Sequence, residues 1–226
     1  MRKNIIFICA VAFSTLAFSQ KKPFDKVSID AFISETQFGS DSQNDVDLIW
    51  WIPTEYWNAI FAQDPSTSQS EKDIIISMLK DLAVVIVIKG KVGVFGGITY
   101  DTKENIKAIT SISYKGEKLK MASEDEIDPD VLNFMSIIKP MMKNMLGSMG
   151  ENMQMFIFEN PKDKAVLPID PYSDNELKFT LGTLERNVSL PLSCLLEEKI
   201  CTEDNSEWNG KWNFCPIHGT KLSQKE

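Results

Sequence analysis

The sequence predicts an α+β fold built on a mainly antiparallel sheet. Helical and strand patterns follow one another in blocks and not in strict strand–helix–strand alternation, which is typical of α+β domains. Apolar segments also flank two short Lys-Gly turns, as in β-hairpins. The chain has 226 residues, of which 43% are hydrophobic and 25% charged. This composition is globular, and the length suits one domain with a small appendage.

Residues 1–19 have the pattern of a secretory signal peptide. Arg2 and Lys3 give a positive start, Ile5–Phe18 is apolar, and small residues lead to a predicted cleavage after Ser19. The apolar run of about 14 residues is shorter than the roughly 20 that a membrane span needs. An uncleaved anchor is the alternative. We therefore expect a periplasmic or secreted protein with no transmembrane segment after cleavage.

The mature chain is strongly acidic. The formal net charge is −8, and cleavage removes two positive charges and no negative ones, which makes it about −10. No basic stripe is present in the sequence. This balance argues against nucleic acid or anionic lipid as a partner. We expect a protein or small-molecule partner, which the sequence does not identify.

The predicted α+β domain comprises residues 20–196. Short helices and strands alternate in its first half. The patterns predict a helix at 29–35, a strand at 47–52, a helix at 54–62 and a helix from Ser68 to about Leu82. Ser68 and Glu71 form a capping box at the start of the last of these helices. Four aromatic residues nearby can belong to the core or to a contact surface, and the core is favoured: Trp50, Trp51, Tyr56 and Trp57.

Two hairpins are predicted next. Ala83–Ile88 is apolar throughout and should be buried on both faces, with a return strand across the Lys89–Lys91 turn. Gly96 and Gly97 suggest a bulge in that return strand or a close approach of another backbone segment. The second hairpin joins 108–114 to 117–121, and its alternating pattern suggests a sheet with one wet face.

The remainder of the domain begins with a helix and continues as strands. Asp128 and Pro129 form a helix start, and the helix should continue to about Gly147 with a kink at Pro140. Strands are then expected at 153–158, 177–181 and 188–196.

The tail, residues 197–226, contains a short internal repeat. CTEDNSEW begins at Cys201 and CPIHGTKL begins at Cys215. Each segment has a potential metal ligand three residues after the cysteine, namely Asp204 and His218. Two such turns facing each other can supply four ligands to one tetrahedral ion. Cys201, Asp204, Cys215 and His218 are therefore the candidate metal ligands.

The second turn resembles the knuckle of zinc ribbons, W-x-F-C-P-x-C-G-x-x-L. The residues that match this pattern are Trp212, Phe214, Cys215, Pro216, Gly219 and Leu222. His218 stands where the family usually has cysteine, and Asp204 departs further from the pattern of the first knuckle. The resemblance covers Cys201–Leu222 and implies a structural zinc ion. The whole chain is also similar to uncharacterised bacterial secreted proteins that end in such a knuckle, which implies no activity.

Three states of the tail cysteines remain open. Zinc can hold them, a Cys201–Cys215 disulfide can join the same hairpin in an oxidising compartment and leave Cys194 over, or the thiols can be free. With zinc or with a disulfide, the expected role is structural, because a small tail with few core residues needs a covalent or metal link.

A methionine-rich segment spans residues 135–155. It holds seven of the ten methionines, and Met141, Met145, Met149 and Met153 recur every four residues. Thioethers are ligands for Cu(I), so extracytoplasmic copper handling is an alternative function. Methionine is also an adaptable core filler, and ordinary packing or an exposed contact surface explains the same spacing.

The sequence carries few signs of catalysis. It has one histidine, and the common nucleophile, phosphate-loop, zinc-protease and dinucleotide motifs are missing. The acidic residues at 124–130 precede a helix start, where carboxylates favour the helix dipole. We therefore expect an exported, non-catalytic accessory or binding protein. A hydrolase is a weaker alternative, because paired carboxylates can be far apart in sequence.

Overall fold

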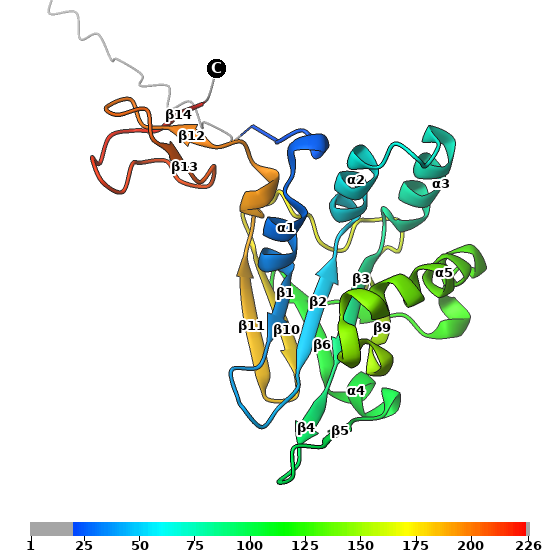
Figure 1. Cartoon of the computed structure of the whole chain (residues 1–226). Coiled ribbons are helices and arrows are strands. Elements are labelled where there is room, and N and C mark those ends of the chain that lie inside the picture. Colours follow the sequence, from blue (N-terminus) through cyan, green and yellow to red (C-terminus); the bar gives the residue numbers. More distant parts are fainter. Residues whose placement is uncertain (1–19, 225–226) are drawn as a thin grey trace, which may run out of the picture.

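Two antiparallel sheets and a set of helices make up the main part of the computed structural model, which describes residues 20–224 (Figure 1). The signal-peptide prediction for residues 1–19 lies outside the described residues. All ladders between named strands are antiparallel, and the α+β class is confirmed. Within 20–224, none of the helices combines the length and the apolarity of a membrane span.

The larger sheet has the strand order β1-β2-β3-β9-β8. Its strands are β1 (Gln37–Gly39), β2 (Leu48–Ile52), β3 (Ala83–Ile88), β9 (Gln154–Glu159) and β8 (Lys120–Met121). Strand β3 lies between β2 and β9, and all its residues are buried, as its unbroken apolar sequence predicts.

The second sheet has the order β11-β10-β6-β7. Its strands are β11 (Leu184–Ser189), β10 (Glu176–Leu181), β6 (Thr110–Tyr114) and β7 (Glu117–Lys118). Burial alternates along β6 and β10, as expected for one wet face. The predicted turn between β6 and β7 is confirmed, with Lys115 at φ 53° and Gly116 at φ 76°. Positive φ at both positions is the signature of a type I′ turn.

Alternating side chains of β2 join the layers. Trp51 lies 6.3 Å from Phe179 of the second sheet, measured between ring centroids. Trp50 contacts Tyr56 on the helical side at 5.8 Å. The four aromatic residues singled out in the sequence are almost fully buried, so their assignment to the core is confirmed: Trp50, Trp51, Tyr56 and Trp57. The helices of this layer include α1 (Ile29–Thr36), α2 (Thr54–Gln63) and α3 (Gln69–Leu79).

The first predicted hairpin is wrong in its pairing. Strand β3 does not pair with the segment after Lys89, because β2 and β9 occupy both of its edges. A hairpin forms instead in the next segment of the chain, between β4 (Gly90–Val92) and β5 (Ile98–Tyr100). Gly96, at φ +82°, and Gly97 belong to the turn and not to a bulge.

Other boundaries also differ from the prediction. Helix α4 (Lys103–Ile109) was not predicted. Because this helix extends to Ile109, strand β6 begins at Thr110 and not at residue 108. The strand predicted at 188–196 is wrong, because β11 already ends at Ser189 and residues 193–195 form a 3-10 helix. The carboxylate of Glu35 accepts hydrogen bonds from the backbone of Ser193 at 2.7 Å and of Cys194 at 2.8 Å, which holds this turn.

Helix α5 (Pro129–Met145) begins as predicted. The side chain of Asp128 caps it by accepting a hydrogen bond from the Asp130 amide at 2.8 Å, and Pro129 is its first residue. The helix ends near the predicted position, and Pro140 lies within it. Trp57 of α2 contacts Phe134 of α5, with ring centroids 5.6 Å apart, so α5 belongs to the helical layer.

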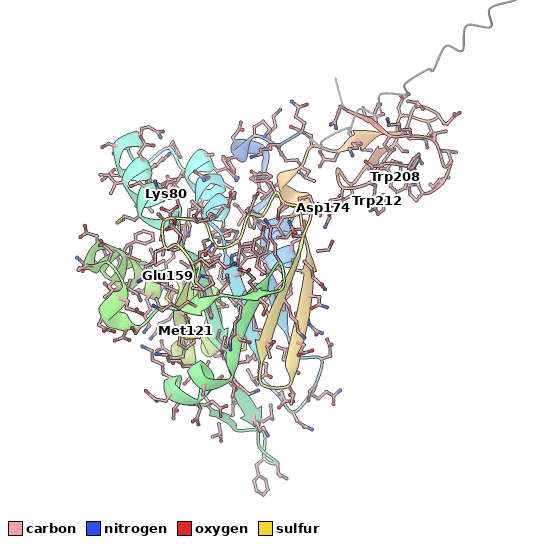
Figure 2. All side chains as sticks on the ribbon, turned by 180° about the vertical axis from the view of Figure 1, so that it is seen from behind. Lys80, Met121, Glu159, Asp174, Trp208 and Trp212 are labelled. Atoms are coloured by element: carbon pink, nitrogen blue, oxygen red, sulfur yellow. The ribbon has the colours of Figure 1, made fainter. Side chains whose placement is uncertain are left out.

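The tail has a small core of its own. Strands β12 (Lys199–Ile200), β13 (Glu207–Trp208) and β14 (Ser223–Gln224) pair there. Cys201, Cys215 and Leu222 are buried together, and Trp208 packs on them. The ring of Trp208 packs against that of Trp212 at a centroid distance of 5.6 Å, with the ring planes tilted by 30° (Figure 2). The tail lies beside the end of the two sheets near the described N-terminus (Figure 1).

Candidate metal centre

The internal repeat of the tail is a repeat of backbone geometry. In the first turn, the Cys201 amide donates to the Ser206 carbonyl at 2.9 Å, and the Asn205 amide donates to the Cys201 carbonyl at 2.9 Å. In the second turn, the corresponding bonds run from Cys215 to Thr220 at 2.8 Å and from Gly219 to Cys215 at 2.9 Å. The two halves of the sequence repeat therefore fold in the same way.

Both turns depend on a residue in the left-handed region. Asn205 has φ 59° and Gly219 has φ 68°. Glycine adopts this conformation freely, and asparagine does so more readily than most other residues. Each occurs four positions after the cysteine, so the sequence places the tolerant residues where the turns need them.

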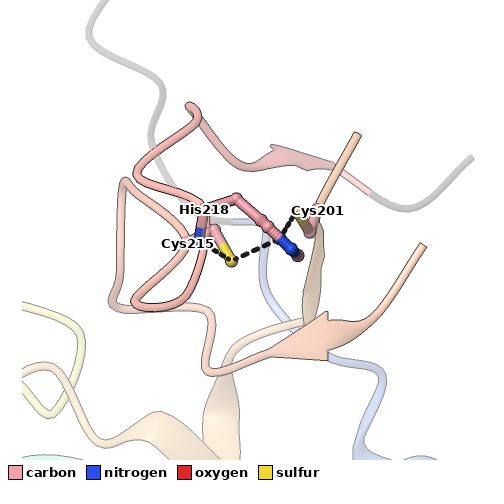
Figure 3. A group of neighbouring side chains, drawn as sticks. All are labelled: Cys201, Cys215 and His218. Atoms are coloured by element: carbon pink, nitrogen blue, oxygen red, sulfur yellow. Dashed lines mark hydrogen bonds between the residues drawn. The ribbon is translucent and has the colours of Figure 1, made fainter. Parts of the chain in front are cut away.

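The two turns bring three of the four predicted ligands together (Figure 3). The Nδ1 atom of His218 lies 3.4 Å from the Sγ atom of Cys201 and 3.6 Å from that of Cys215. All three ligand atoms lie within 4.8 Å of one another. The His218 amide also donates to the Cys215 sulfur at 3.4 Å. Cys201, Cys215 and His218 thus form a group that can hold a metal ion.

The fourth predicted ligand, Asp204, is close to this group but outside it. Its Oδ2 atom lies 4.0 Å from Nδ1 of His218. Its Oδ1 atom accepts hydrogen bonds from the Ser206 amide at 3.0 Å and from the Ser206 hydroxyl at 2.6 Å. These bonds hold the pKa of Asp204 below its usual range, so the carboxylate is charged and directs its second oxygen toward the imidazole.

The electrostatics of the group favour a Cys201 thiolate beside a protonated His218 imidazole, which must lose its proton to coordinate zinc. The pKa of Cys201 is lowered to about 7, first by its contact with the Thr220 hydroxyl and then by the Glu203 amide, His218 and Cys215. The pKa of His218 is raised, first by the Cys201 thiol and then by the charge of Asp204. Both cysteines are buried, whereas the side chain of His218 is 35% exposed. A thiolate and an imidazole in contact are the ligands that zinc prefers.

Cys194 lies away from the group. It belongs to the 193–195 turn beside Glu35, and burial raises the pKa of its thiol to about 12. In residues 20–224 all three cysteines are free thiols, so the structure contains no Cys201–Cys215 bond.

Two site residues were not singled out from the sequence. Ser206 holds Asp204, and Thr220 contacts the Cys201 sulfur at 3.5 Å. Both residues occur five positions after a cysteine, and their backbone carbonyls accept hydrogen bonds from the backbone amides of those cysteines. The repeated spacing of a hydroxyl residue after each cysteine was therefore the available signal.

The methionine-rich segment is divided between core and surface. Met142 and Met153 are buried, whereas Met141 and Met145 are about half exposed. Helix α5 ends at Met145 and a 3-10 turn follows at 147–152, so the four-residue spacing does not continue on one helical face to Met153. Core packing therefore explains part of the segment.

The acidic segment at 124–130 is used for local structure. Glu124 pairs with Lys103, and Glu126 pairs with Lys120 and accepts hydrogen bonds from Ser123. Asp128 caps α5.

Comparisons of the chain with protein-family models, with curated proteins and with solved structures found no match.

Proposed function

We propose that Cys201, Cys215 and His218 bind one structural zinc ion that closes the tail of an exported, non-catalytic accessory or binding protein. The supporting observation is the spacing of the ligand atoms. Zinc bonds of about 2.3 Å to sulfur and about 2.0–2.1 Å to nitrogen place tetrahedral sulfur and nitrogen ligands roughly 3.5 Å apart. The two sulfur–nitrogen distances here are 3.4 Å and 3.6 Å.

Asp204 is the proposed fourth ligand. Its Oδ2 atom faces Nδ1 of His218 at 4.0 Å, whereas oxygen and nitrogen ligands of one tetrahedral zinc ion lie about 3.3 Å apart. A side-chain movement of less than about 1 Å closes this difference. Asp204 also occupies the position in the first turn that His218 occupies in the second, so the repeat supports the same role for both.

A structural role follows from the size of the tail core. Three buried side chains and one packed tryptophan bury too little apolar surface to hold a separate element. In such modules the free energy of metal binding becomes free energy of folding. The two cysteines are buried within this core, so the ion would link the turns from inside and not from an open cleft.

The test is the metal content and free-thiol count of mature protein, residues 20–226, prepared by export. We expect about one zinc ion per chain. Cys215→Ser and His218→Ala should lose it, whereas Cys194→Ser, the matched cysteine outside the group, should keep it. Protein without metal would contradict the proposal. One reactive thiol after unfolding would then indicate a Cys201–Cys215 disulfide, and three would indicate free cysteines.

Export is a separate part of the proposal and has its own measurement. Its support is the composition of residues 1–19. A chain recovered outside the cytoplasm should begin at Gln20, which intact mass determines. Recovery of the full-length chain in the cytoplasm would contradict export without affecting the zinc site.

A further inference from the structure

The first described residues of the chain are paired with the segment that leads into the tail. We use the name N-terminal strap for residues 20–22. Lys21 forms an antiparallel bridge with Leu196, and the Glu197 amide donates to the Gln20 carbonyl at 2.8 Å. The strap lies next to the start of the tail (Figure 1). It therefore fixes the chain at the point where the tail leaves the main domain.

Side chains anchor the N-terminal strap as well. The Nζ atom of Lys22 lies 2.6 Å from Oε1 of Glu198, and the Lys22 side chain is only 14% exposed. The Nζ atom of Lys21 lies over the ring of Tyr172, 3.8 Å from its centroid, which is a cation–π contact. Gln20 is exposed, and its side-chain amide makes no hydrogen bond to the rest of residues 20–224. The strap thus holds the backbone of Gln20 and leaves its side chain in solvent.

We propose that Gln20 of the exported chain cyclises to pyroglutamate. The proposal rests on the export and on the cleavage after Ser19 proposed above, which make Gln20 the first residue of the mature chain. An α-amino group titrates at about pH 8, so part of it is unprotonated and nucleophilic at neutral pH. In a glutamine at the start of a chain, this nitrogen and the side-chain amide carbon Cδ belong to one residue and can close a five-membered ring.

The step balances within the residue. The α-amino nitrogen attacks Cδ, a bond forms between these two atoms, and the bond from Cδ to the side-chain nitrogen breaks. That nitrogen leaves as ammonia with one proton of the attacking amine, and nothing is oxidised or reduced. The product is a lactam that, like the ring of proline, includes the backbone nitrogen and Cα. The Gln20 carbonyl takes no part, so its bond with the Glu197 amide is retained.

The ring protects the N-terminal strap from trimming. The ends of a chain are common sites of proteolysis, and an aminopeptidase recognises a free α-amine, which the lactam lacks. Removal of the strap would delete its backbone bonds to residues 195–197 and the Lys22–Glu198 ion pair. The segment that leads into the tail would then lose its pairing partner. Cyclisation therefore preserves the contact that fixes the tail to the main domain.

Mass spectrometry of the exported protein tests the proposal. The intact mass and the sequence of the N-terminal peptide are measured directly after recovery from outside the cytoplasm. We expect a chain that begins at Gln20 and is lighter than residues 20–226 by one molecule of ammonia, with the loss located at Gln20. Gln20→Asn is the matched control. Its side chain is one methylene shorter, so the same attack would need a strained four-membered ring, and the control should keep its full mass and a free α-amine.

The outcomes separate cyclisation from export. A wild type that begins at Gln20 with a free α-amine would overturn cyclisation and leave export intact. A chain that keeps residues 1–19, or that begins at another residue, would overturn both without affecting the zinc site. The same loss of ammonia in Gln20→Asn would locate the loss at another residue and also overturn the proposal.

Digestion with an aminopeptidase tests the protection of the N-terminal strap. The enzyme should shorten the Gln20→Asn chain and thereby speed hydrogen exchange at the Glu197 amide, whereas the wild type should keep its full length and its protection. Equal shortening of the two chains would contradict a protective ring.

Discussion

The Nδ1 atom of His218 lies 3.4 Å from the Sγ atom of Cys201, although the two residues belong to different turns. This contact joins the two halves of the tail repeat. Because the halves share a core of only a few side chains, we expect a link at this point to decide whether the tail is folded.

We predict that removal of the metal unfolds the tail and leaves the sheets intact. With a strong chelator, the amides that close the two turns, such as those of Cys201 and Cys215, should exchange hydrogen about tenfold faster or more, which corresponds to about 1.4 kcal/mol of lost local stability. The amides of β3, which lies between two other strands, should not change. Hydrogen-exchange mass spectrometry measures both. Unchanged protection of the tail after chelation would argue against a metal link.

Asp204→Asn should weaken zinc binding by at least roughly 10–100-fold, the range found when an outer-shell partner of a metal ligand is lost, because Asp204 is proposed as a ligand itself. The physical reason is that Oδ2 faces the ligand group, at 4.0 Å from Nδ1 of His218. Competition with a chromophoric chelator gives the affinity. Glu203→Gln removes the same charge from the same turn and should have a much smaller effect. Equal effects of the two variants would show that Asp204 acts by charge alone.

The buried ion pair between Lys89 and Asp47 should be important for stability. The Nζ atom of Lys89 lies 2.9 Å and 3.0 Å from the two carboxylate oxygens, and the side chains are 13% and 3% exposed. Lys89→Met leaves a buried carboxylate unpaired and should lower the free energy of unfolding by about 3–5 kcal/mol. Denaturant unfolding measures the change.

Lys178→Met is the matched control for that variant. It breaks the exposed Lys178–Glu185 pair, whose side chains are 42% and 58% exposed, and should cost no more than about 1 kcal/mol. Similar losses in the two lysine variants would contradict the special role of the buried pair.

Glu55→Gln should stabilise the protein at neutral pH. Burial raises the pKa of Glu55, and its Oε2 atom is buried without a hydrogen-bond partner in the described residues. A carboxyl whose folded pKa is raised favours folding when protonated, so its contribution falls as the pH rises above the unfolded value of 4.5. Unfolding curves of the variant and the wild type should therefore differ at pH 7 and converge toward pH 4. A difference that does not depend on pH would show that the side chain is not buried as a charge.

The methionine-rich segment should not bind Cu(I) stoichiometrically. Met153 is buried, and Met141 and Met145 are about half exposed, so the four-residue series does not form one surface. In an anaerobic Cu(I) titration of zinc-loaded protein, the wild type and the variant with leucine at 141, 145 and 149 should take up the same amount. A lower uptake by the variant would support the copper-handling alternative.

Much of the local structure was predictable from short patterns. The cap and proline that begin α5, the Lys115-Gly116 turn and the buried character of β3 each depend on residues that are neighbours in the chain. The metal-ligand types were predictable for the same reason, since each turn holds its cysteine and its partner within four residues. The fixed backbone of the turns leaves little freedom in how these residues point.

Pairing between distant segments was decided by the tertiary structure. The sequence by itself determined that Ala83–Ile88 is a buried strand, but not that β2 and β9 would occupy its two edges and displace the hairpin to β4 and β5. It predicted four candidate ligands, of which the fold brings three together, whereas the position of Asp204 depends on how the two turns face each other. The exposure of Phe95 likewise results from the displaced hairpin. The physical reason is that local patterns fix backbone conformation and burial, whereas the choice among competing strand edges depends on all segments at once.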